Sequence, residues 1–395
     1  MPQIIPSSVR ISAQDWLTRP ETQRVMAVLG HENARFVGGC VRNAVLGEPV
    51  SDVDIATLLP PETVMHVMAE SGILCLPTGL SHGTVMAVLH GLSYEITTLR
   101  QDLETDGRHA VVAYTQDWVA DAQRRDFTMN TLLADHEGQV YDPLGAGLAD
   151  LEAHRVVFVG DSALRIAEDA LRILRYFRFY GRYGAGAPDK SALVACRNAA
   201  LSLECLSRER ISQEFFKILM GPRVVEILAL MCAHDVLPVF RFKAYQPDVL
   251  DRLCALQDTY GAGALSARIG VLSGWQQDNL GTLETRCVLP NKLKAEISAL
   301  QNILAGELPV TESAQRRALY RAGRETTLQG FLIAMAQGPV VGQEAHIGAW
   351  LEKIRTQDIP VFPVTGEDLL KAGYTTGPAL GAKLKALEAE WLQTL

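Results

Sequence analysis

Two aspartates near the N-terminus have the spacing of a metal site. Asp52 and Asp54 lie in the segment SDVDIAT (51–57), whose alternation of polar and apolar residues is typical of a half-buried strand. Side chains two residues apart on a strand leave the same face, so the two carboxylates are expected to lie close together. They repel one another unless a divalent cation lies between them, and such hard oxygen ligands suit Mg²⁺. A DxD pair alone is more often an exposed strand edge.

A pair of glycines precedes these aspartates. Gly38 and Gly39 separate an apolar run at 34–37, expected to be a strand, from a helical pattern at 41–46. Backbone N–H groups can approach a ligand closely at glycine, and a helix N-terminus attracts anions, which Arg42 in the first turn would also reach. A lone glycine pair is usually a turn. Its combination with the aspartates within 17 residues indicates a nucleotide site of the two-metal type.

A further carboxylate completes this predicted site. Glu95 lies in the expected strand 92–99, on the face opposite Tyr94 and Ile96. One metal ion would activate an attacking hydroxyl and the other would hold a triphosphate. The sequence contains no GxxxxGK[ST] motif, which excludes a P-loop protein.

Two arginine-rich segments follow, RRDFTMN (124–130) and RIAEDALRILRYFRF (165–179). A helix that begins at Asp161 or Ser162 would place charged residues on one broad side, at spacings of three and four: Arg165, Asp169, Arg172 and Arg175. On its own, this pattern favours a helix with salt bridges on a solvated face.

The charge is unevenly distributed. The formal net charge is −8, which argues against a nucleic-acid partner. Residues 1–189, however, contain 15 Arg and no Lys against 24 Asp+Glu, a net −9, while residues 190–395 have a net charge of +1. Arginine presents a rigid fork of donors that suits phosphates and base edges, although a compositional bias toward Arg is an alternative explanation.

The length of 395 residues predicts two or three domains. Short strands and helices alternate up to about residue 160, with strands expected at 84–89, 139–141 and 156–159, a helix at 60–71, and a charged loop at 101–110; the pattern from Ser162 onward is almost wholly helical. No apolar run is long enough to span a membrane. The seven scattered cysteines and the lack of a signal peptide indicate a cytosolic protein without a disulfide framework or zinc site.

Four motifs together resemble the bacterial tRNA CCA-adding enzymes, the class II nucleotidyltransferases that also include bacterial poly(A) polymerases. They are GGCVRN…SDVDIAT, RRDFTMNTL, DPLGAGLADL and RIAEDALRILRYFRF, in the order and spacing of that family. The resemblance is strong over residues 30–235 and weaker over 365–381. It implies an α+β protein with a polymerase-β-like mixed α/β head followed by a helical neck, body and tail. The corresponding boundaries are 22–157, 158–240, 241–325 and 326–395.

The resemblance also implies roles for individual residues. Asp52 and Asp54 would hold catalytic Mg²⁺, and Glu95 is the further catalytic candidate. The predicted nucleotide-binding residues are Gly38, Gly39, Arg42, Arg125, Asp126, Asn130, Asp169, Arg172, Arg175 and Arg178. The substrates would be tRNA, CTP and ATP, with no membrane partner, and the oligomeric state stays open.

Three local features qualify the match. Asn43 stands where the family usually has Asp, and we expect a structural role for it. The usual DPxGG is extended to DPLGAG (142–147). Residues 104–108 form a candidate mobile loop with Gly107 as a hinge, or an ordinary surface loop.

Base selection is expected to rest on Asp169 and Arg172. A carboxylate accepts from the amino group of cytosine or adenine, and an arginine donates to the neighbouring ring acceptor. Uracil and guanine would place a carbonyl against the carboxylate, which leaves a buried acceptor unpaired.

Two alternative functions remain for the protein: a poly(A) polymerase of the same superfamily and a catalytically silent RNA-binding protein.

Overall fold

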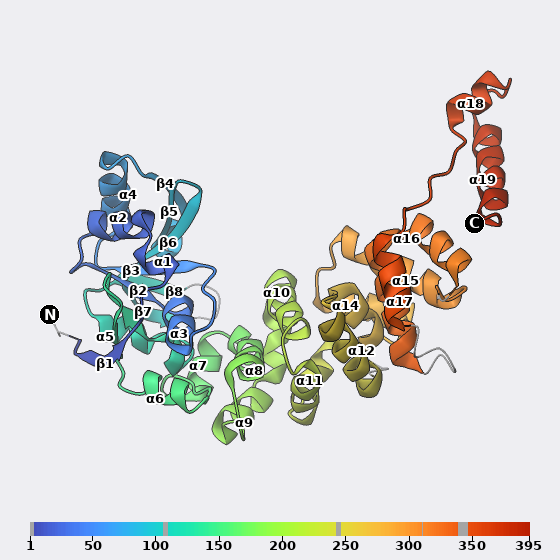
Figure 1. Ribbon diagram of the computed structural model, residues 1–395. Helices are drawn as coiled ribbons and strands as arrows, with labels where there is room; N and C mark the ends of the chain where they lie inside the picture. The colour runs from blue at the N-terminus through green and yellow to red at the C-terminus, as the bar shows by residue number, and fades with distance from the viewer. Residues whose placement is uncertain (1–3, 106–109, 242–245, 310, 339–346) are drawn as a thin grey trace. The chain divides into compact units, whose positions relative to one another are not determined.

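The computed structural model describes residues 4–105, 110–241, 246–309, 311–338 and 347–395. The contacts divide the chain into two compact units (Figure 1). The first contains Met1–Leu206 with Leu230–Val239, and the second contains Ser207–Ala229 with Phe240–Leu395. Within the described residues, no helix is long and apolar enough to cross a membrane.

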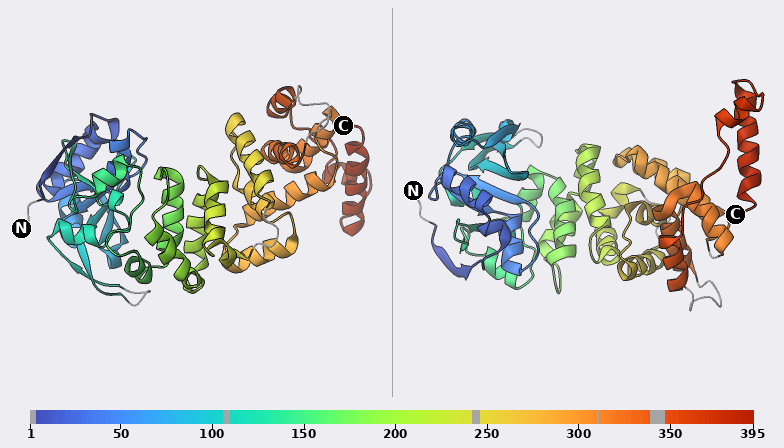
Figure 2. Two further views of the ribbon diagram at one scale, coloured as in Figure 1. Left: turned by 90° about the horizontal axis from the view of Figure 1, so that it is seen from below. Right: turned by 45° about the horizontal axis from the view of Figure 1, so that its top comes forward.

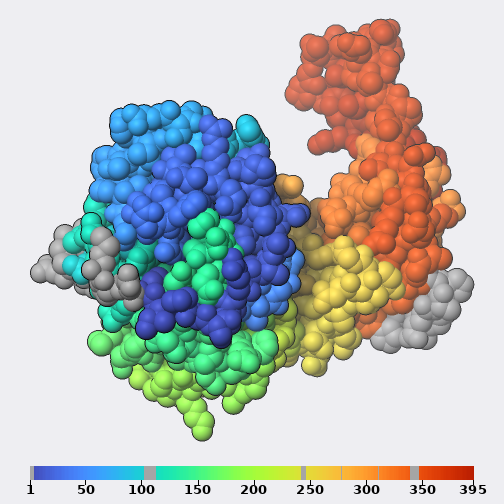
Figure 3. Space-filling view, turned by 60° about the vertical axis from the view of Figure 1, so that its left-hand side comes forward, coloured from blue at the N-terminus to red at the C-terminus, as the bar shows by residue number. Residues whose placement is uncertain are grey.

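The first unit is built on an eight-stranded mixed sheet with the strand order β1-β10-β9-β2-β3-β6-β5-β4. The strands are β1 (Pro6–Arg10), β2 (Ala34–Val37), β3 (Val53–Thr57), β4 (Leu74–Gly79), β5 (Thr84–Leu89), β6 (Leu92–Thr98), β9 (Leu133–Ala134) and β10 (Gln139–Tyr141). Strand β1 pairs with β10 in antiparallel orientation. In Figure 3, dark-blue N-terminal residues accordingly lie beside green-teal residues on the surface. The central strands β3 and β6 are parallel, and Phe36, Ile55 and Ile96 of β2, β3 and β6 are fully or almost fully buried.

In the chain, helices alternate with the strands of this sheet. They are α1 (Asp15–Thr18), α2 (Pro20–Leu29), α3 (Gly39–Leu46), α4 (Pro61–Glu70), α5 (Trp118–Gln123) and α6 (Gly147–Glu152). These elements confirm the strands predicted at 34–37, 84–89, 92–99 and 139–141 and the helix predicted at 60–71.

Two local predictions for this unit were wrong. The segment expected to be a charged loop contributes β7 (Arg100–Thr105), which pairs with β8 (Ala110–Tyr114), because the apolar run AVVAY supplies a partner strand. The proposed hinge at Gly107 lies outside the described residues. The segment 156–159 forms no strand and makes only an isolated bridge from Phe158 to Phe127.

The predicted long helix after residue 161 is in fact two helices. Helix α7 (Ser162–Glu168) ends at Asp169, whose extended backbone has φ −153°, and α8 (Leu171–Tyr183) begins two residues later. Asp169 Oδ1 accepts a hydrogen bond at 3.1 Å from the backbone N–H of Leu171, the first residue of α8. The four charged residues therefore do not share one uninterrupted helical face.

Aromatic side chains attach α8 to the RRDFTMN segment. The ring of Phe127 lies 5.0 Å from that of Phe179 and 4.9 Å from that of Phe158, which stacks on Tyr176 at 5.6 Å. These rings are almost wholly buried, and such pairs add to the stabilisation from burial alone. The first unit also includes α9 (Lys190–Asn198) and part of α11 (Val224–Ala233).

The regular secondary structure in the described residues of the second unit is helical, as the yellow, orange and red part of Figure 2 shows. Its helices are α10 (Arg208–Leu219), α12 (Pro247–Tyr260), α13 (Leu265–Leu272), α14 (Gln277–Arg286), α15 (Asn291–Ala305), α16 (Glu312–Gln337), α17 (Ile347–Thr356), α18 (Gly366–Lys371) and α19 (Pro378–Leu392). Helix α16 breaks at Gly323, which has φ +74°. Beyond the break, Gly330 allows α15 to approach so closely that a Cβ there would lie 2.7 Å from Ile303.

Candidate active site

Parallel strand pairing brings two of the predicted carboxylates together. Asp54 on β3 and Glu95 on β6 are direct partners in the register, so their side chains leave neighbouring strands on the same face. Asp52 precedes β3 by one residue and is exposed, and it accepts a hydrogen bond from the hydroxyl of Ser51 at 3.0 Å. The expectation that the strand includes both aspartates is therefore wrong for Asp52.

The surroundings of Asp54 disfavour its negative charge. Burial, followed by the charges of Glu95 and Asp52, raises the pKa of Asp54 to about 6, and Arg125 acts in the opposite direction. In the described part of the chain, no three His, Cys, Asp or Glu side chains already form a cluster that could hold a metal ion. Asp54 is half-buried and lies close to the negative charges of Glu95 and Asp52. This environment fits a divalent cation, because the cation would offset the repulsion between the carboxylates.

This environment predicts that Asp54 lowers the stability of the metal-free protein at neutral pH. The folded protein holds the Asp54 proton more tightly than the unfolded chain does, so the free energy of unfolding decreases as the pH rises from about 4 through about 6. Asp54→Asn should therefore be more stable than the wild type at pH 8, by up to about 3 kcal/mol, since each pKa unit corresponds to about 1.4 kcal/mol. The measurement is urea unfolding with EDTA.

Below about pH 4 the two proteins should be equally stable, since Asp54 is then protonated in the folded state and largely so in the unfolded chain. A lower stability of Asp54→Asn at pH 8 would contradict the assigned environment.

The glycine pair begins helix α3, as predicted. Gly38 is the residue before the helix and has φ +71° and ψ −123°, a conformation that L-residues with a side chain rarely adopt. A Cβ on Gly38 would lie 3.8 Å from Nη1 of Arg125. The turn therefore brings backbone N–H groups at the start of a helix next to an arginine, which is an arrangement suited to a phosphate.

Arg125 is held by an aspartate that sequence reasoning missed. Asp121, which is 3% exposed, accepts from Nη2 of Arg125 at 2.8 Å and from Nε of Arg124 at 2.8 Å. Burial alone would raise the pKa of Asp121, but the two guanidinium groups hold it below its ordinary value. The signal was present in the sequence, because Asp121 precedes the arginines by three and four residues on the helical segment α5.

Arg42 is almost fully buried and is bound on several sides. Its Nη1 donates to Asn130 Oδ1 at 2.6 Å, and its Nη2 donates to the hydroxyl of Tyr183 at 2.7 Å. The side-chain carbonyl of Asn43 accepts from Nε at 3.2 Å and from Nη2 at 2.9 Å, while its amide donates to the carbonyl of Pro49. Asn43 thus has scaffold contacts of the kind expected for it.

Asp126 belongs to the same network. It is 8% exposed and accepts from Nε of Arg175 at 2.7 Å and from the amide of Asn130 at 2.9 Å. Burial would raise the pKa of Asp126, but Arg175 and the hydrogen bonds hold it below its ordinary value. The contacts of Asp126 and Asn130 are those of a scaffold that connects Arg42 with α8.

Two further arginines of the predicted nucleotide site, Arg172 and Arg178, also have contacts within the protein. Arg172 donates to the carboxylate of Glu168 and to the backbone carbonyls of Arg165 and Arg124, the latter two at 2.7 and 2.9 Å. Arg178 lies over the ring of Phe179 at 4.5 Å. The structure does not place Asp169 and Arg172 on one continuous helix, and their proposed pairing on a base stays a prediction.

The DPLGAG segment packs against the same motif. Asp142 Oδ1 accepts from the N–H of Gly145 at 3.0 Å and forms a turn, after which α6 begins at Gly147. A Cβ on Gly147 would lie 2.6 Å from the carbonyl oxygen of Thr128, so only glycine fits there. The turn is thereby fixed beside RRDFTMN.

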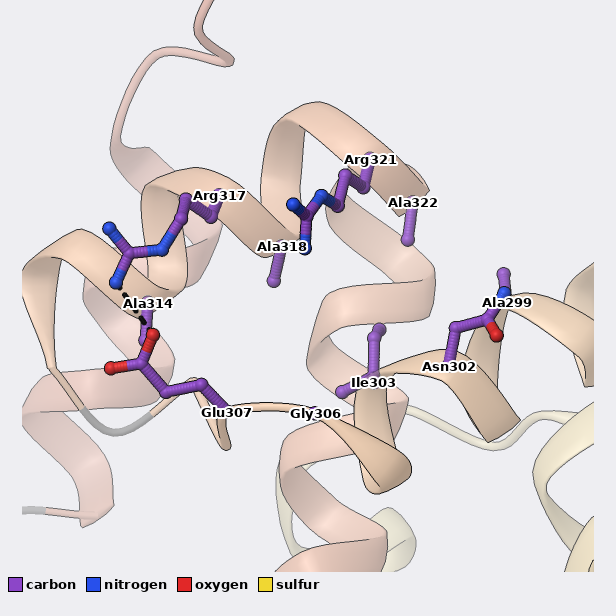
Figure 4. A pocket seen from close by; sticks show the side chains of 10 residues that line it. All are labelled: Ala299, Asn302, Ile303, Gly306, Glu307, Ala314, Arg317, Ala318, Arg321 and Ala322. Carbon is purple, nitrogen blue, oxygen red and sulfur yellow. Dashed lines mark hydrogen bonds and ion pairs between the residues drawn. The ribbon is translucent and has the colours of Figure 1, made fainter. Parts of the chain in front are cut away.

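Arginines of α16 line a cavity of about 500 Å³ in the second unit (Figure 4). Arg317 pairs with Glu307 at 2.6 Å, and Arg321 lies along the same wall, near Ala318. Arg324, after the break at Gly323, donates to backbone carbonyls at the end of α17. Arg316 and Arg321 are exposed on the surface of this helix.

Comparisons with known proteins identify the family of the chain. Residues 34–157 match the family described as "Poly A polymerase head domain", and residues 187–242 match "Probable RNA and SrmB-binding site of polymerase A". The CCA-adding enzyme of Limosilactobacillus fermentum is 34% identical over 376 residues, which cover 90% of this chain and 87% of that protein. The human mitochondrial CCA tRNA nucleotidyltransferase 1 is 32% identical, with 90% and 82% covered.

A solved structure is also similar over nearly the whole chain. The crystal structure of the Bacillus stearothermophilus CCA-adding enzyme in complex with CTP superposes with a TM-score of 0.72 at 29% identity, and covers 94% of this chain and 91% of that one. The chain therefore belongs to the family of CCA-adding tRNA nucleotidyltransferases.

Proposed function

We propose that the protein adds C, C and A from CTP and ATP to the 3′ end of tRNA in a Mg²⁺-dependent reaction that releases pyrophosphate. The observation that carries the proposal is the position of Asp54 and Glu95 on adjacent strands, with the charges of Asp52 and Arg125 acting on Asp54, in a member of this family. The relative solved with CTP supports the nucleotide substrate. The test is incubation with tRNA that lacks CCA, with CTP and ATP given singly and together.

The reaction would be in-line attack of the tRNA 3′-hydroxyl on the α-phosphorus of the nucleotide. Asp52 and Asp54 would hold Mg²⁺, which when bound lowers the pKa of the attacking hydroxyl and screens the developing charge. Arg125, oriented by Asp121, would neutralise phosphate oxygens beside the N–H groups of the Gly38–Gly39 turn. Glu95 would complete the acidic face.

The neck would select the base. Asp169 is fixed at the start of α8 by the hydrogen bond that its Oδ1 accepts from the N–H of Leu171. We expect Asp169→Ala to relax discrimination against UTP by about tenfold or more, since an unpaired buried acceptor is worth about 1–3 kcal/mol. The measurement is competitive incorporation of CTP and UTP, with Asp161→Ala as a control that removes the cap of α7 instead. An unchanged CTP/UTP ratio would contradict the base-reading role.

A poly(A) polymerase remains the second candidate, because residues 34–157 match a family with that description. The two functions differ in the length of the product.

We also propose a division of the chain into a head at 22–157, a neck at 158–240, a body at 241–325 and a tail at 326–395, and a cytosolic location. Arg316 and Arg321 are the proposed contacts of the second unit with the tRNA backbone.

A further inference from the structure

Tyr183, the last residue of α8, contacts a proposed phosphate-binding arginine that is 141 positions away in the sequence. Its hydroxyl accepts from Nη2 of Arg42 at 2.7 Å and donates to Oδ1 of Asn43 at 3.1 Å. Its ring lies beneath the guanidinium, 4.3 Å from the central carbon to the ring centroid. Tyr183 is 6% exposed, and its hydrogen bond with Arg42 is buried.

We propose that Tyr183 is a positioning residue for nucleotide binding, which holds the Arg42 guanidinium beside the Gly38–Gly39 turn. This inference rests on the proposed function and on the prediction from the sequence that Arg42 binds the phosphates of the incoming nucleotide. An arginine side chain has many rotamers, and a ligand that must order it loses affinity by that entropy. Tyr183 fixes the guanidinium before the ligand arrives.

The electrostatics of this position favour an anionic ligand. The hydrogen-bond partners of Arg42 are Asn43, Asn130 and Tyr183, none of which contributes a formal negative charge. Burial lowers the pKa of Arg42, Tyr183 acts in the opposite direction, and the nearby cations Arg178 and Arg182 lower it further. Tyr183 therefore holds the arginine in place and leaves its charge for a ligand, whereas a carboxylate would neutralise that charge.

The orientation of the network is defined. The amide of Asn43 donates to the carbonyl of Pro49 at 3.0 Å, so its oxygen must face Arg42 and Tyr183. That oxygen accepts the hydroxyl proton of Tyr183, and the lone pairs of the hydroxyl are then available to Arg42. A phenylalanine at position 183 would keep the ring under the guanidinium and remove only the hydrogen bonds.

The test compares Tyr183→Phe with Tyr180→Phe in steady-state kinetics on tRNA that lacks CCA. Tyr180 is a matched control, because it lies on the same helix, is 4% exposed, and donates a partly buried hydrogen bond to the carbonyl of Gly186 at 2.6 Å. Tyr183→Phe should raise KM for CTP about tenfold, since a bond to a charged group is lost, while kcat changes less than about twofold. Tyr180→Phe should leave KM unchanged, although both variants lower the melting temperature.

A second measurement asks whether Tyr183 acts through Arg42. In an Arg42→Lys background, Tyr183→Phe should add almost nothing to KM. Fully additive effects, an unchanged KM in Tyr183→Phe, or an equal increase in Tyr180→Phe would overturn the inference. A wild-type protein that incorporates no nucleotide would instead refute the proposed function, which keeps the two failures distinguishable.

Discussion

Replacing Asp54 by alanine is expected to reduce nucleotide incorporation into tRNA by at least about 1,000-fold, which corresponds to a loss of about 4 kcal/mol of transition-state stabilisation. Asp54 is the carboxylate that β3 holds against Glu95, and it is the one whose pKa the neighbouring acids and burial raise. Without it, a bound metal ion would lack its most enclosed proposed ligand at the acidic face, and the hydroxyl and phosphates would lose the stabilisation that the metal supplies. The measurement is incorporation of labelled CTP under single-turnover conditions.

Two companion variants make this result decisive. Asp54→Asn keeps the shape and should be equally inactive, although it is expected to be more stable than the wild type at pH 8, so loss of folding cannot explain the loss of activity. Glu62→Ala, an exposed acid in the first turn of α4, should have wild-type activity. An Asp54→Ala rate within about tenfold of the wild type would remove Asp54 from the catalytic residues.

Asp126→Ala is expected to lower the free energy of unfolding by about 3 kcal/mol, as for other buried charged pairs that lose one partner. The change leaves the Arg175 guanidinium and the Asn130 amide without their common acceptor, and it also breaks the link from α8 to Arg42. Urea unfolding measures the stability. Incorporation should also fall, because Arg42 loses part of its support.

The pH dependence checks the same interaction. The folded-state pKa of Asp126 is lowered, so its ionised form contributes stability above the unfolded pKa of about 4, and that contribution is lost as the pH falls through the folded value. The difference between the wild type and Asp126→Ala should therefore shrink as the pH falls below about 4. A difference of less than about 1 kcal/mol at pH 7 would mean that Arg175 and Asn130 find other partners.

The short-range parts of the site could be predicted from the sequence. The strand 34–37, the glycine turn and the helix after it follow from local periodicity and from glycine chemistry, and the structure contains all three. The pairing of Asp54 with Glu95 was accessible only as a hypothesis, because the register of two parallel strands depends on how the whole sheet assembles.

Features that depend on contacts between distant residues could not be predicted from local sequence patterns. The break at Asp169 accompanies a local hydrogen bond from the N–H of Leu171 to the Asp169 side chain, which competes with an otherwise continuous helical pattern. The contact between Tyr183 and Arg42 joins residues 141 positions apart, and nothing in local periodicity reports it. Asp52 falls just outside its strand because β3 begins at Val53, and strand ends are set by pairing partners more than by the residues themselves.

Product analysis on a tRNA that lacks CCA tests the central claim most directly. The purified protein is incubated with Mg²⁺, CTP and ATP, and the 3′ ends are sequenced. The account predicts that three nucleotides are added, in the order C, C, A, that CTP alone gives at most two, and that extension then stops. A long tract of A, or no incorporation at all, would contradict it.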